Sequence, residues 1–312
     1  MNRIKDLVTA YLKLVMPCIA LLPGVVDASS LKETLLTDFE QYKQSQTLQS
    51  LPFILDSTNL GGVLQASVDT LLTGVPYDLF VQNLSQVAEW CEFLPIHLNI
   101  KACAYTKDES GTVLRSYVGS KGYMNPDQAS LLRLNFIART EGEVFLIDMS
   151  AKSGPYGSSD YQFTISAIEV DGGIFMSFDL SSAPGIASSL VSIYFLTVAR
   201  KKIGFSVDGK TWSGRTKYVG GQRGAAERNV VRYLLAIKTY FDTLDLPESE
   251  RFERRIDLWF TATEKYARQL REMDRESYLS IKRRERKNQI ILISSLQNNV
   301  VPVYEVEVKK DR

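Results

Sequence analysis

The chain has 312 residues, of which 45% are hydrophobic and 23% are charged, and its formal net charge at pH 7 is +1. These proportions are those of a globular protein with a sizeable core. They exclude the overall basic charge of a typical nucleic-acid-binding protein, and no segment is long and apolar enough for an internal transmembrane helix.

The N-terminal segment predicts export. Three basic residues within the first 13 positions precede an apolar run from Leu14 to Val26, which ends in compact residues before two serines. This order is typical of a secretory signal peptide, here cut after Ala28, and we expect a periplasmic location. An uncleaved anchor or an ordinary first helix is the alternative. Cleavage removes three of the 37 basic and two of the 36 acidic residues, so the exported chain is neutral.

Two cysteines stay in the exported chain. Cys18 leaves with the signal peptide, whereas Cys91 and Cys103 lie in the stretch WCEFLPIHLNIKAC, which also holds the only histidine, His97. In an oxidising compartment such a pair is typically joined, and closing this loop contributes roughly 3 kcal/mol of stability. Free structural cysteines, a metal site and a Cys–His nucleophile are the alternatives, although a zinc site usually has four ligands. We expect a disulfide, a local hydrogen-bonding role for His97, no metal and no cofactor.

Hydrophobic periodicity divides the rest of the chain into elements. Helical spacing predicts helices over residues 29–47 and 76–94, and alternation predicts a strand over 64–70. Alternation then continues through six further strands between residues 98 and 181, and Asp171-Gly172-Gly173 predicts a hairpin turn between the last two. Further helices are predicted over 185–202, 225–243 and, as the longest, 248–273. The last residues, 301–310, alternate like a strand or form a loose tail.

The order of these elements resembles the helix-grip fold of START-like lipid-transfer and polyketide-cyclase-like domains. Stretches such as DYQFTISAIEVDGGIFMSFDLS and GGQRGAAERNVVRYLLAIKTYF are similar to a family of exported bacterial proteins with that fold. The resemblance covers about residues 50–290 and implies an α+β fold, with a curved seven-stranded antiparallel sheet wrapped on a long C-terminal helix. Extra helices between Pro184 and Leu246 leave open which helix grips the sheet. No catalytic motif comes with the resemblance.

The expected domains follow from this division of the chain. They are a signal peptide at 1–28, an N-terminal helix at 29–50, the START-like domain with additional C-terminal helices at 51–290, and a tail or edge strand at 291–312.

A curved sheet wrapped on one helix can enclose a cavity for an apolar ligand. We expect the inward side chains of the sheet to line it, namely Phe136, Phe163, Ile165, Met176 and Phe178. The ligand would be a hydrophobic small molecule or lipid, held without chemical reaction. The alternative is that these residues simply fill a core.

The stretch GGQRGAAERN precedes a predicted helix and suggests contact with an anionic or polar head group. Arg223 and Arg228 are the candidate residues, because a guanidinium can hold a carboxylate or phosphate by two hydrogen bonds. The alternative is a loop and a capped helix with ion pairs between Glu227 and Arg228.

The basic run from Lys282 to Lys287 has two interpretations. It is a solvated helix face with acidic neighbours, or it contacts the surface of an anionic membrane. Its cationic members are Lys282, Arg283, Arg284, Arg286 and Lys287.

An enzyme acting on a lipid or polyketide-like substrate is the alternative function. No G-x-S-x-G motif is present, so the candidates are paired carboxylates such as Asp148, Glu169 and Asp179. A filled interior would instead indicate a scaffold protein.

Overall fold

The computed structural model describes residues 28–46, 51–109, 111–183 and 202–304. The predicted signal peptide and almost all of the helix predicted over 185–202 lie outside the described residues. Of the segment expected as a tail or edge strand, 291–312, residues 291–298 are helical, residues 300–304 have no regular secondary structure, and residues 305–312 lie outside the described residues.

Eight strands form one antiparallel sheet in the order β1-β2-β8-β7-β6-β5-β4-β3. Strands β3 to β8 form a meander in chain order, and the β1–β2 hairpin pairs with β8 through β2. The strands are β1 Ile54–Leu60, β2 Val63–Leu72, β3 Ile100–Asp108, β4 Gly111–Val118, β5 Ser130–Glu141, β6 Val144–Ser153, β7 Ser159–Val170 and β8 Gly173–Ala183.

All seven predicted strands are present in this sheet, and β1 is its one strand that was not predicted. Its sequence ILDSTNL contains Asp, Ser and Asn, which are uncommon in strands, and it lies at the edge of the sheet. The predicted turn between β7 and β8 is confirmed, with Gly172 at φ +90°. That backbone angle favours glycine, since side chains clash there.

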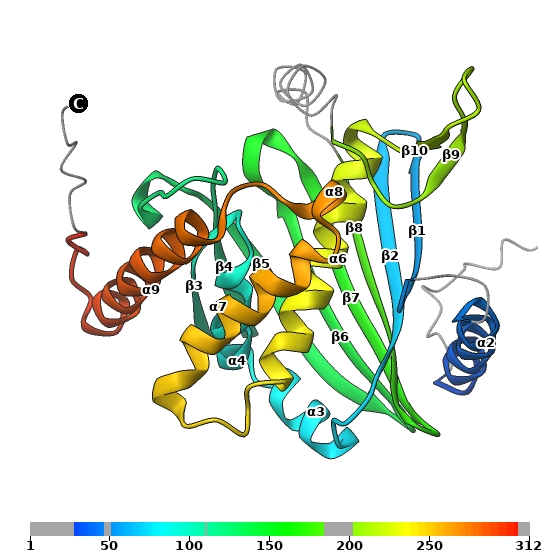
Figure 1. Ribbon diagram of the computed structural model, residues 1–312. Coiled ribbons are helices and arrows are strands. Elements are labelled where there is room, and N and C mark those ends of the chain that lie inside the picture. The colour runs from blue at the N-terminus through cyan, green and yellow to red at the C-terminus, as the bar shows by residue number, and fades with distance from the viewer. Residues whose placement is uncertain (1–27, 47–50, 110, 184–201, 305–312) are drawn as a thin grey trace, which may run out of the picture.

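Helix α6 (Gly221–Phe241) lies across the inner face of the curved sheet (Figure 1). It contacts β1, β2 and β8, and it therefore is the gripping helix that the resemblance left open. Helices α3 (Tyr77–Leu84) and α4 (Val87–Phe93) and the short η1 (Leu94–Ile96) cover the remainder of the inner side. The expected α+β fold, a large antiparallel sheet with a long helix across it, is confirmed.

The opposite, outer face of the sheet is half covered. Helix α2 (Ala28–Gln46) packs Leu35, Phe39 and Tyr42 against a patch that includes Leu146 and Phe175. The sheet is thus covered by helices on both sides, which follows from the apolar stripe of α2.

The helix predicted over 248–273 is wrong in its extent. Helix α7 (Glu248–Glu264) ends early, and α8 (Ala267–Leu270) follows as a single turn. A new helix, α9 (Arg275–Asn298), then begins where the Asp274 carboxylate accepts a hydrogen bond from the Ser277 backbone N–H. A capping residue of this kind satisfies a free N–H and favours a helix start. Helix α9 packs against β3 through residues such as Leu292.

Candidate ligand-binding interior

The five predicted cavity residues all point to the inner face and lie in one buried cluster. Phe136 comes from β5, Phe163 and Ile165 from β7, and Met176 and Phe178 from β8. Ile165 pairs directly with Phe178 across the two strands, which brings their side chains together on one face. The alternation of the strands thus identified the face correctly.

Tyr233 of α6 stands at the centre of this aromatic wall. Its ring meets Phe163 and Phe178 edge-on, with centroids 6.2 and 6.0 Å away. It also stacks on the ring of His97 at 4.7 Å. Tyr233 is only half-buried, as are Tyr161 and Leu180 on neighbouring strands. This part of the inner face is therefore less completely packed than the fully buried residues around it.

His97 follows η1 and is 1% exposed. Its Nδ1 accepts a hydrogen bond from the Asn99 backbone N–H at 3.1 Å, which confirms the expected local role. Since Nδ1 accepts, the neutral ring carries its proton on Nε2. Nε2 has no hydrogen-bond partner among the described residues. Within the described part of the chain, His97 thus presents an unused donor beside Tyr233.

Burial lowers the pKa of His97 well below its ordinary value, and nearby cations lower it further. The largest electrostatic effect comes from Arg232, followed by Lys282 and Lys101. The imidazole is therefore neutral at pH 7 and lies in a positive surrounding, where an acceptor or an anion is favoured.

Arg232, near the middle of α6, is buried and belongs to an ion-pair network. Its Nη2 donates to Glu272 at 2.7 Å and to the Leu270 carbonyl at 3.0 Å, whereas its Nε has no partner among the described residues. Glu272 also pairs with Lys121 at 2.7 Å and Lys202 at 3.0 Å. Burial alone would raise the pKa of Glu272, but Arg232 and the two lysines outweigh it and hold that pKa at about 2.

The two arginines predicted to contact a head group lie in different surroundings. Arg228 is buried, its Nη1 donates to the Ile203 carbonyl at 3.1 Å, and its Nε has no partner among the described residues. Burial, followed by the charge of Arg232, lowers the pKa of Arg228 to about 10. Arg223 is half-buried and donates from Nε to the Ser57 hydroxyl at 3.2 Å. Only Arg228 thus joins the buried positive surrounding.

Glu227, between these arginines, is a structural acceptor. Its carboxylate accepts hydrogen bonds from the Ser57 hydroxyl at 2.5 Å and from the backbone N–H groups of Phe205 at 2.6 Å and Ser206 at 3.0 Å. It therefore ties α6 to β1 and to the segment before residue 207.

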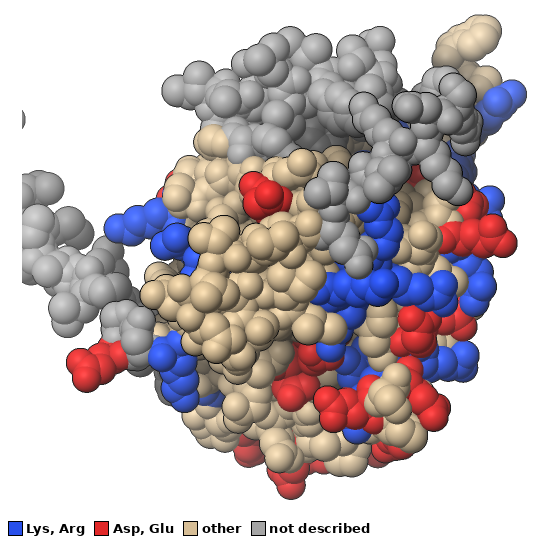
Figure 2. Space-filling view, turned by 90° about the vertical axis from the view of Figure 1, so that its left-hand side faces the viewer, with Lys and Arg blue, Asp and Glu red and all other residues tan. Residues whose placement is uncertain are grey.

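The basic run at 282–287 is largely engaged with the protein itself. Lys282 is buried and bonds to Glu285, Arg283 pairs with Glu253, and Arg286 pairs with Glu92. Arg284 lies over the ring of Tyr123, and Lys287 is exposed. Figure 2, which looks onto the side that carries α9, shows basic and acidic side chains intermixed.

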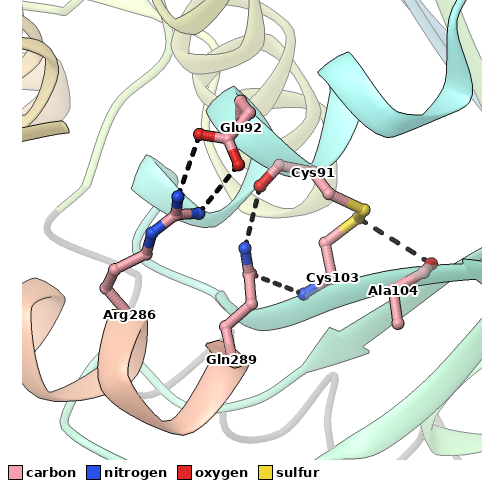
Figure 3. Close-up of a disulfide and its surroundings, with 6 residues drawn as sticks. All are labelled: Cys91, Glu92, Cys103, Ala104, Arg286 and Gln289. Carbon is pink, nitrogen blue, oxygen red and sulfur yellow. Dashed lines mark hydrogen bonds and ion pairs between the residues drawn. A yellow bond between two sulfur atoms is a disulfide. The ribbon is translucent and has the colours of Figure 1, made fainter. Parts of the chain in front are cut away.

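The predicted disulfide between Cys91 of α4 and Cys103 of β3 is present. Gln289 of α9 reaches both ends of it, accepting from the Cys103 N–H at 2.9 Å and donating to the Cys91 carbonyl at 3.0 Å (Figure 3). Beside it, Arg286 makes two hydrogen bonds to Glu92. The disulfide, with Gln289, is thus a structural link between α4, β3 and α9.

Thiol counting on denatured, unreduced protein that lacks residues 1–28 should find no free thiol. Reduction should release two, because Cys91 and Cys103 are joined. Two thiols before reduction would contradict the disulfide and return Cys91 to the reactive candidates.

The carboxylates proposed for an enzyme do not converge in the interior. Asp148 and Asp179 lie on the outer face, where Asp148 pairs with Arg139, and Glu169 is exposed near the end of β7. A groove of about 300 Å³ crosses β1, β2, β7 and β8, but its lining is mainly polar and includes Asp56, Thr164 and Asp179. It does not suit an apolar ligand.

Two further structural observations concern the described residues. They contain no group of three or more His, Cys, Asp or Glu side chains that could hold a metal ion. None of their helices is both long and apolar enough to span a membrane.

Tyr233 and Arg232 were not among the residues predicted from the sequence. The available signal was the pair Arg228 and Arg232, four residues apart in α6, with the apolar residues Val230, Val231 and Leu234 beside them. Two arginines at helical spacing on a face that the pattern assigns to the core indicate a buried polar site.

No protein-family model matches this sequence, and no curated protein matches it. Similar solved structures include the major latex-like protein 151 of Panax ginseng, with 11% identity, 60% of this chain and 100% of that chain covered, and a TM-score of 0.34. Ara h 8.0201 has 13% identity, 58% and 96% coverage and a TM-score of 0.33. The di-domain ARO/CYC BexL from the BE-7585A biosynthetic pathway has 13% identity and a TM-score of 0.35, with 70% of this chain and 61% of that chain covered. At these values none of them assigns a function to this chain.

Proposed function

We propose that the protein binds a hydrophobic small molecule or lipid that carries a hydrogen-bond-accepting group, and holds it without chemical reaction. The binding region is the inner face near Tyr233. The observation that carries the proposal is the Nε2–H of His97, which finds no acceptor among the described residues and is buried beside the half-buried ring of Tyr233.

A buried donor without a partner costs about 1–3 kcal/mol, so a ligand that supplies an acceptor removes that cost. The apolar part of such a ligand would lie against Phe163, Phe178 and Tyr233. Its acceptor would face His97, where Arg232 exerts the largest effect of the nearby positive charges. An acid of the lipid class fits both requirements.

The location proposed for this activity is the periplasm, after cleavage behind Ala28. The disulfide supports export, because such bonds persist in oxidising compartments. The placement of Asp148 and Asp179 on the outer face gives no support to an enzyme built on those carboxylates.

Native mass spectrometry of protein released from the periplasm without detergent tests the proposal. We expect a discrete additional mass that organic extraction removes. A mass equal to the polypeptide alone, unchanged after incubation with a dansyl-labelled long-chain fatty acid, would overturn it.

Replacing Phe178 with leucine should weaken binding of that dansyl-labelled acid about fivefold or more, since part of the aromatic wall is lost. Fluorescence titration measures the Kd. Phe175→Leu is the matched control, because Phe175 is equally buried on the same strand but faces α2. Its Kd should stay within about twofold of the wild type. Equal losses in the two variants would indicate a general loss of packing instead.

Replacing His97 with phenylalanine should weaken the acid about tenfold or more, because the ring stays but the Nε2–H donor is lost. The same replacement should weaken binding of the probe's methyl ester less, since the acceptor of the ester carries no charge. His97→Gln, which keeps a side-chain N–H, should recover part of the affinity. Unchanged affinity for the acid in folded His97→Phe protein would remove His97 from the site.

A further inference from the structure

A hairpin extends from the body of the protein beside β1 and β2 (Figure 1). It consists of β9 (Val207–Lys210) and β10 (Thr216–Tyr218), and every residue from 207 to 217 is exposed. At its tip Trp212 is fully exposed, at 104% of its reference area, whereas Trp90 and Trp259 are buried at 2% and 1%. A large aromatic side chain held wholly in water is unfavourable unless something covers it.

The turn holds Trp212 outward in a defined shape. The Thr211 N–H donates to the Arg215 carbonyl at 2.7 Å, and the Gly214 N–H donates to the Thr211 carbonyl at 2.8 Å. The Thr211 hydroxyl accepts from the Arg215 N–H at 3.1 Å. Gly214 has φ +76°, which this tight turn requires and which other residues rarely adopt. The tip is therefore preorganised around the tryptophan.

The hairpin is also cationic. Its acidic residue, Asp208, pairs with Lys217 at 2.7 Å. Lys210 and Arg215, which flank the tip, make no ion pair among the described residues. As far as the described residues show, Trp212 thus lies between two positive charges that no carboxylate neutralises.

The base of the hairpin is fixed to α6. Glu227 binds the backbone N–H groups of Phe205 and Ser206, just before β9. Tyr218, at the end of β10, lies under the guanidinium of Arg268 at 4.8 Å. The tip therefore projects at a set position relative to the gripping helix.

We propose that this tip is a docking surface for an anionic lipid membrane, with Trp212 inserted at the level of the head groups and Lys210 and Arg215 on the phosphates. Tryptophan favours that boundary because it has an apolar body and a polar N–H, and anionic lipids attract basic side chains. The tip consists otherwise of Thr, Ser and Gly. A specific protein interface buries about 800 Å² on each partner, which a tip of this size cannot supply alone.

Vesicle binding tests the inference independently of any interior ligand. The probe is a phosphatidylglycerol–phosphatidylcholine vesicle, with pure phosphatidylcholine for comparison. Because the other two tryptophans are buried, a blue shift and reduced quenching by acrylamide report Trp212. We expect co-sedimentation and a blue shift with the anionic vesicle but not with pure phosphatidylcholine, and we expect salt to weaken both.

Trp212→Ser should reduce the partition coefficient about tenfold. The double variant with Lys210→Glu and Arg215→Glu should reduce the partition coefficient about thirtyfold or more. The matched controls are Ile137→Ser on β5 and Lys238→Glu on α6, which are exposed elsewhere and should leave binding unchanged. The inference would be overturned if the protein did not bind the anionic vesicle. It would also be overturned if Trp212→Ser bound as well as the wild type.

Discussion

Replacing Glu285 with glutamine is expected to destabilise the protein by about 3–5 kcal/mol. Glu285 of α9 is buried between two buried lysines, Lys101 of β3 at 2.9 Å and Lys282 at 2.7 Å. Both ammonium groups also donate to backbone carbonyls, Lys101 to Leu98 and Lys282 to His97. Without the carboxylate, two buried cations share one site with no opposite charge, and neither can reach water.

The pH dependence of this loss distinguishes a charge effect from a packing effect. Burial already lowers the pKa of Lys101, and it lowers that of Lys282 to about 8 even though Glu285 works in the opposite direction. When folding lowers the pKa of a lysine, the folded protein becomes more stable as the pH rises and less stable as the pH falls. The difference between wild type and Glu285→Gln should therefore shrink between pH 7 and pH 10. Urea unfolding at each pH measures it.

Glu253→Gln is the control for that experiment. Glu253 pairs with Arg283, also of α9, but both side chains are about half exposed. Exposed pairs contribute about 0–1 kcal/mol, so this variant should stay close to the wild type. If the two variants lost equal stability, or if the Glu285→Gln deficit did not change with pH, the buried charge cluster would not have the role assigned to it.

The sequence alone does not predict these contacts. The run from Lys282 to Lys287 has one composition but several environments, because Lys282 and Glu285 face β3 while Lys287 faces solvent. The partner of Glu285 is Lys101, 184 residues away. Periodicity identifies a helix but not the strand on which it packs.

The sheet was more accessible to prediction than the site. Alternation located seven strands, since a period of two fixes the face of every residue in a strand. It also identified five side chains on the inner face, namely Phe136, Phe163, Ile165, Met176 and Phe178. Strand β1 lacked the signal because Asp56, Ser57 and Asn59 interrupt its apolar residues. The meeting of His97 with Tyr233 joins segments that are far apart in the chain, and only the packing of η1 against α6 creates it.

Acid unfolding should depend on Glu272 in a defined window. Its pKa of about 2 in the folded protein, against an ordinary value of 4.5, means that its ionised form stabilises the fold above about pH 4.5. That stability, roughly 3 kcal/mol, is lost as the pH falls from 4.5 towards 2. Glu272→Gln should thus be less stable than the wild type at pH 7, and the two should converge near pH 2. Denaturant unfolding across this range gives both values.

Glu264→Gln provides the comparison, because Glu264 pairs with Arg271, whose side chain is exposed. Its effect should remain below about 1 kcal/mol. A Glu272→Gln deficit that stayed constant down to pH 2 would show that shape, not charge, holds Arg232, Lys121 and Lys202 together. Convergence would instead establish that the carboxylate keeps these three cations together. Two of them, Arg232 and Lys121, belong to the positive surrounding of His97 on which the proposed ligand site depends.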